Sequence, residues 1–186
     1  MEDKIQLKIT SALPISEKNS LLKGMDINME ALSSLLTTLR DELDRGRTSD
    51  EPEEMTDKDL EGDYRIAYDL CQKASYRDAL PILLGLLADR PFDQRFHFAA
   101  GICFQQLQEY VPAAVLFGQA LMLNTDDAAS AFRLGESLVA AGQAERAEHA
   151  FDMALELINA DYDNFYNLSG PTEAWLTQLR TDTSKG

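Results

Sequence analysis

The chain has 186 residues, of which 45% are hydrophobic, 17 are lysine or arginine and 32 are aspartate or glutamate. This size and apolar content predict one globular domain with polar appendages, and they exclude a fibrous or wholly disordered protein. The formal net charge of −15 argues against nucleic acid and anionic membranes as partners, because both select a basic surface.

The N-terminal segment, residues 1–46, contains one clear helical pattern. Asn28 can cap a helix over residues 28–45, and Gly46 marks its end. One face of this helix carries a stripe of apolar side chains, formed by Met29, Leu32, Leu35, Leu36, Leu39 and Leu43. No stretch of the chain resembles a secretory signal or approaches the ~20 apolar residues of a membrane span. We therefore expect a cytoplasmic protein whose stripe packs against another surface.

Residues 47–59 form a predicted linker, because they are acidic and almost free of apolar side chains. Thr56 and Asp59 have the spacing of a capping box, a pair that hydrogen-bonds reciprocally at the start of a helix. We expect this pair to begin the folded domain, which the linker separates from the N-terminal helix.

A repeat of 34 residues follows the linker. Residues 94–127 laid on 128–161 match at Phe98/Phe132, Gly101/Gly135, Ala113/Ala147, Phe117/Phe151, Ala120/Ala154, Leu121/Leu155, Leu123/Leu157 and Asp127/Asp161. A weaker copy covers residues 60–93. Small residues recur where two helices must approach closely, and bulky ones where the gap between them is filled, a pattern that resembles the tetratricopeptide repeat. The prediction is an all-α solenoid of three helical hairpins within residues 60–180, the fewest that bury a continuous core.

The end of the chain is predicted to cap the solenoid. Ser169, Gly170 and Pro171 open a helix over residues 171–180. Within it, Trp175 and Leu179 share the face that covers the last repeat, and the opposite face is polar. We expect residues 181–186 to be disordered.

The sequence offers no catalytic constellation. His97 and His149 lie in different predicted helices and make no ligand pair with either cysteine. Cys71 and Cys103 sit inside apolar helical patterns, where a reduced cysteine acts as a small hydrophobic residue. We therefore expect no enzyme, no cofactor and no metal site, and we look for a binding surface instead.

The first helix of each repeat lines the inner, concave wall of such an array. An aromatic residue recurs at the fifth position of every repeat, as Tyr64, Phe98 and Phe132. An inner wall with three aromatics and few charges predicts a groove for an apolar peptide. The predicted peptide-binding residues are Tyr64, Tyr68, Cys71, Arg95, Phe98, Ile102, Gln105, Gln106, Phe132, Glu136 and Val139. The alternative is that the aromatics belong to the core between helices, or that the chain's own N-terminal segment covers them.

Three segments resemble the translocator chaperones of bacterial type III secretion, also called class II chaperones. They are Tyr64-Arg-Ile-Ala-Tyr68-Asp-Leu, Tyr76-Arg-Asp-Ala79-Leu-Pro and Gly101-Ile-Cys-Phe-Gln-Gln-Leu, within a resemblance that covers about residues 60–158. The resemblance implies a cytoplasmic bacterial protein that keeps hydrophobic, pore-forming translocators soluble until export. It implies that an extended segment near the client's N-terminus enters the groove, with Gln105 and Gln106 available to its backbone. It also implies a homodimer, for which Leu32, Leu35, Leu36, Leu39 and Leu43 are the candidate contacts.

A second hypothesis is a general tetratricopeptide-repeat adaptor that assembles other proteins. One form of it clamps a carboxylate tail, which needs Lys, Arg and Asn on the inner wall. Arg95 is the one basic candidate there, beside Glu61 and Glu136. A scaffold that binds through its outer face is therefore the stronger version of this alternative.

Overall fold

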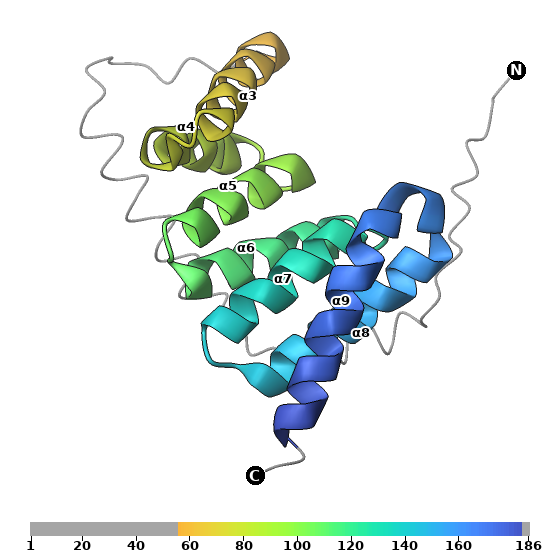
Figure 1. Cartoon of the computed structure of the whole chain (residues 1–186). Helices are drawn as coiled ribbons and strands as arrows, with labels where there is room; N and C mark the ends of the chain where they lie inside the picture. The colour runs from red at the N-terminus through yellow and green to blue at the C-terminus, as the bar shows by residue number, and fades with distance from the viewer. Residues whose placement is uncertain (1–55, 184–186) are drawn as a thin grey trace, which may run out of the picture.

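The computed structural model describes residues 56–183, and within them the chain is all-helical (Figure 1). The helices are α3 (Asp57–Gln72), α4 (Tyr76–Asp89), α5 (Gln94–Gln106), α6 (Tyr110–Leu123), α7 (Ala128–Ala140), α8 (Ala144–Ala160) and α9 (Tyr162–Thr183). The predicted all-α architecture is confirmed. The N-terminal helix predicted over residues 28–45, its leucine stripe and most of the predicted linker lie outside the described residues.

Consecutive helices pack against one another along the whole array. They form three hairpins, α3 with α4, α5 with α6 and α7 with α8, and each hairpin stacks on the next element in the chain (Figure 1). The buried side chains of all seven helices join in one hydrophobic cluster. The stacked hairpins thus bury a continuous core that none of them could form alone.

Two glycines set the distance between the helices of a hairpin. A Cβ atom on Gly101 would lie 2.8 Å from the ring of Phe117, and one on Gly135 would lie 2.7 Å from the ring of Phe151. Both rings are fully buried. The aromatic side chain of one helix therefore occupies the space that a side chain on the other would need, as the sequence pattern predicted.

The capping box predicted at the start of the domain is present. The backbone N–H of Asp59 donates to Thr56 Oγ1 over 3.3 Å, and the N–H of Thr56 donates to the Asp59 carboxylate over 3.2 Å. Because α3 begins at Asp57, the last three residues of the predicted linker, 57–59, are helical. The linker prediction was wrong for these residues, since the cap starts the helix before the apolar pattern does.

The last helix is longer than the sequence predicted. α9 begins at Tyr162, runs through Pro171 and ends at Thr183, so the predicted start at residue 171 and the predicted disorder of residues 181–183 were wrong. Proline removes a single helical hydrogen bond, and Thr172 replaces part of that loss by donating its hydroxyl to the carbonyl of Leu168 over 2.7 Å. Burial of Leu176 and Leu179 against the array holds the helix together on the far side of Pro171.

Candidate functional site

The predicted peptide-binding residues lie on α3, α5 and α7, which are the first helices of the three hairpins. Their exposure differs strongly from one residue to the next. Tyr68 on α3 is 52% exposed. Half-buried positions are Tyr64, Cys71, Phe98, Ile102, Gln105, Glu136 and Val139, while Arg95 and Gln106 are exposed. The wall is therefore uncovered mainly over α3 and the middle of α5.

The three aromatics of the fifth position do not share one environment. Tyr64 packs on Phe96, with 5.3 Å between ring centroids, and keeps part of its surface free. Phe98 is also half-buried and meets Phe117 edge to face at 5.5 Å. Both rings therefore combine a role in the core with a surface that a partner could cover.

Phe132 corrects the prediction. Its side chain is only 5% exposed and packs edge to face on Phe151, with 5.7 Å between the centroids. The alternative that the aromatics belong to the core between helices is therefore right for Phe132. The physical cause is the close approach of α7 and α8 at Gly135, which brings the Phe151 ring against this face of α7.

Two cysteines meet beneath the wall where α3 faces α5. The Sγ atoms of Cys71 and Cys103 are 3.4 Å apart, and both thiols are free. Cys103 is fully buried, and burial raises the pKa of its thiol, which favours the protonated form. This arrangement matches the reduced, structural role expected for both residues.

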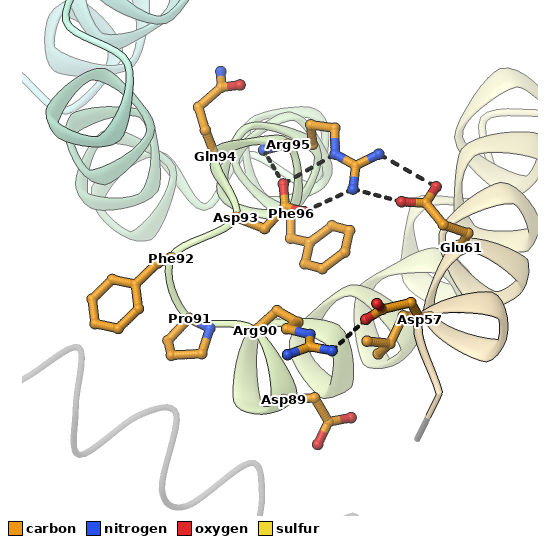
Figure 2. A pocket seen from close by; sticks show the side chains of 11 residues that line it. Asp57, Glu61, Asp89, Arg90, Pro91, Phe92, Asp93, Gln94, Arg95 and Phe96 are labelled. Carbon is orange, nitrogen blue, oxygen red and sulfur yellow. Dashed lines mark hydrogen bonds and ion pairs between the residues drawn. The ribbon is translucent and has the colours of Figure 1, made fainter. Parts of the chain in front are cut away.

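Arg95 joins α3 to α5 at the edge of the wall. Its guanidinium donates to Glu61 Oε1 and to Asp93 Oδ2, both over 2.7 Å, and lies over the ring of Tyr64 at 5.2 Å from the centroid (Figure 2). The hydrogen bond from Arg95 holds the pKa of Asp93 below its ordinary value. The charge of Arg95 is thus already balanced by two carboxylates, which weakens the case for a carboxylate clamp.

A polar cavity of about 370 Å³ interrupts the wall between α5 and α7. It brings together three of the predicted residues, Gln105, Gln106 and Glu136. The sequence analysis missed Arg133, which lines the same cavity and pairs with Glu136 over 2.8 Å. Gln105 donates its amide N–H to Ser137 Oγ over 3.2 Å. This part of the wall therefore suits polar groups of a ligand rather than an apolar anchor.

A larger cavity of about 720 Å³ lies between the start of α3, the end of α4 and the start of α5 (Figure 2). Leu60 and Phe96 supply its apolar lining, and Arg90 pairs with Asp57 at its rim. Phe92, in the loop before α5, is 84% exposed. Sequence reasoning missed Phe92 because it stands between two predicted helices, where no periodicity marks it.

The described residues contain no group of three or more His, Cys, Asp or Glu side chains arranged to hold a metal ion. Among the same residues, no helix has both the length and the apolar character that crossing a membrane requires. What the described part of the chain presents is a binding surface.

Comparison with known proteins places the chain among secretion chaperones, although no family model matches it. Low calcium response locus protein H of Yersinia pestis is 27% identical over 127 residues, which cover 68% of this chain and 75% of the relative. The Yersinia enterocolitica type III secretion chaperone SycD, solved with a peptide of the translocator YopD, superposes with a TM-score of 0.67 at 25% identity. That match covers 70% of this chain and 99% of SycD. The resemblance to the translocator chaperones is confirmed.

Two further chaperone structures agree with this assignment. PcrH, solved in complex with the chaperone binding region of PopD, superposes with a TM-score of 0.68 at 21% identity over 72% of this chain and 99% of PcrH. A second SycD structure, which shows an alternative dimer, covers 70% of this chain and 98% of SycD with a TM-score of 0.65. The tetratricopeptide-like solenoid predicted from the 34-residue repeat is therefore the fold of the translocator chaperones.

Proposed function

We propose that this chain is a cytoplasmic bacterial chaperone that keeps a hydrophobic translocator of a type III secretion system soluble and competent for export. It binds an extended N-terminal segment of the translocator along the wall formed by α3, α5 and α7. The observation that carries this proposal is the row of incompletely covered apolar side chains on that wall, namely Tyr64, Tyr68, Phe98 and Ile102. The translocator peptides bound to SycD and PcrH support it. Binding involves no covalent step, so we expect no enzymatic activity.

The uncovered surface is sufficient for reversible binding. Each of the four side chains could contribute about 1–2 kcal/mol when a partner covers the surface that the chain leaves free. Their sum, about 4–8 kcal/mol, is reduced by the cost of ordering a flexible peptide and increased by main-chain hydrogen bonds. Affinity on the order of micromolar follows. Such binding protects the client in the cytoplasm and still allows its release for export.

Co-expression with a translocator encoded beside the chain tests this proposal. We expect the translocator to stay soluble with the chaperone and to aggregate without it. Tyr68→Ala removes the most exposed apolar side chain of the wall and should weaken binding of the translocator's N-terminal peptide about 5–30-fold, measured by fluorescence anisotropy. A translocator that stays equally soluble without the chaperone would contradict the proposal.

Met122→Ala provides the matched control. Met122 lies on α6, the second helix of its hairpin, and is 48% exposed, close to the exposure of Tyr68. The groove chaperone should retain its client in this variant. Loss of the client in Met122→Ala, with binding retained in Tyr68→Ala, would instead support an adaptor that binds through its outer helices.

A further inference from the structure

α9 begins in the same register as the first helices of the second and third hairpins. Those helices start at Gln94, Ala128 and Tyr162, at intervals of 34 residues, and an aspartate directly precedes each of them. The sequence analysis assigned three repeats and placed a separate capping helix farther along the chain. The positions of the helix starts show that the repeat period continues into α9.

The packing of α9 supports the same register. α9 lies on α8 as α7 lies on α6, and it also contacts α7 (Figure 1). Thr172 is fully buried at the position that Leu138 occupies in α7, and the small Ser169 stands where α7 has Gly135. Trp175 stacks on Phe151 of α8 with 5.8 Å between ring centroids. α9 is therefore the first helix of a fourth, incomplete repeat.

This register places Tyr166 at the fifth position, 34 residues after Phe132. The equivalent rings of Phe98 and Phe132 are covered by Phe117 and Phe151, which lie on the second helix of each hairpin. Within the described residues no second helix follows α9, and Tyr166 is 64% exposed. The fourth aromatic of the series is thus far more accessible than the third.

We propose that the client-binding wall continues onto α9 and that Tyr166 is a further contact for the extended client segment. This inference rests on the proposed function. Neighbouring helices pack about 10 Å apart, so the path from α3 across α5 and α7 to α9 measures about 30 Å. An extended peptide advances about 3.3–3.6 Å per residue, and the client segment must therefore span at least about nine residues.

The wall also predicts how polarity varies along that segment. Apolar contacts are available at one end on Tyr68 and Ile102, and at the other end on Tyr166. Between them lie the buried Phe132 and the polar cavity with its Arg133–Glu136 pair. The ligand that fits is an extended peptide with apolar residues near both ends and polar or small residues in the middle.

Tyr166→Ala tests the extension, with peptides of about 15 residues from the N-terminal region of the co-encoded translocator as probes. We expect the variant to bind the full peptide about 5–20-fold more weakly than the wild type does, and Tyr166→Phe to restore most of the affinity. Tyr162→Ala is the matched control, because Tyr162 lies on the same helix, is 54% exposed and falls outside the groove-facing positions. It should bind as the wild type does.

Peptides truncated at either end separate the two ends of the wall. The effect of Tyr166→Ala should disappear with one truncated peptide, and the effect of Tyr68→Ala should disappear with the other. Wild-type affinity for the full peptide in Tyr166→Ala, or an equal loss with all three peptides, overturns the extension and leaves the proposed function in place. Failure of the wild type to bind any translocator peptide overturns the proposed function itself.

Discussion

His97 shows how a single buried side chain couples this fold to pH. The ring is 5% exposed, and its Nε2 lies 2.8 Å from the carbonyl oxygen of Pro91, to which it donates. Nδ1 is buried without a hydrogen-bond partner, so the ring is neutral with its proton on Nε2. Burial is the main cause that lowers the pKa of His97, against opposing contributions from Pro91 and Asp93. Folding therefore excludes a proton that the unfolded chain binds.

The stability of the domain should consequently fall as the pH falls below about 6.5, the ordinary pKa of histidine. In the unfolded chain His97 takes up a proton near that pH, whereas in the folded protein it does so only at a lower pH. Thermal unfolding followed by circular dichroism from pH 7.5 to 5.5 should show a smaller decrease of Tm for His97→Gln than for the wild type. His149→Gln alters an exposed ring and should keep the wild-type slope. Identical slopes in all three proteins would contradict this account.

At the scale of the element, the hairpin α7–α8 depends on the absence of a side chain at residue 135. Gly135→Ala would place Cβ 2.7–2.8 Å from three atoms of the fully buried Phe151 ring. Because the ring cannot move into solvent, we expect a loss of about 1–3 kcal/mol in the free energy of unfolding. Chemical denaturation measures this directly. Gly85→Ala in α4 is the control, since nothing lies within 4 Å of its added Cβ, and it should be neutral or stabilising by up to about 1 kcal/mol.

The elements were largely predictable because the repeat records their packing. The glycines at 101 and 135 and the buried rings at 117 and 151 mark the helix contacts in the sequence, and the structure confirms each contact. The start of α9 was not predictable from local signals, because Ser169-Gly170-Pro171 is a typical helix boundary and only burial against α8 overrides it.

The binding wall was predicted in position but not in exposure. Periodicity places Phe98 and Phe132 equally, yet the first is half-buried and the second is buried. The difference depends on how closely each hairpin closes around its own aromatic ring, which the 34-residue period does not encode. Arg133 was missed for a related reason, since its pairing with Glu136 follows helical rather than repeat spacing.

For the whole molecule, the wall and the oligomeric state are expected to be separable. Every residue of the proposed client-binding wall lies within the described array of α3 to α9. The candidate dimer contacts, Leu32, Leu35, Leu36, Leu39 and Leu43, belong to the sequence-predicted stripe outside the described residues. Disrupting the stripe should therefore change the assembly state and leave client binding in place.

The last prediction is that the stripe holds two copies of the chain together. Leu35→Asp combined with Leu39→Asp places two charges in an apolar contact and should convert a homodimer to a monomer, measured by size-exclusion chromatography with light scattering. Ser33→Asp combined with Thr37→Asp adds the same charge at the same spacing on the polar face and should remain dimeric. The monomeric variant should bind the translocator peptide within about threefold of the wild-type affinity. A leucine variant that remains dimeric would contradict the stripe as the contact, and one that loses the peptide would show that the N-terminal segment also contributes to the groove.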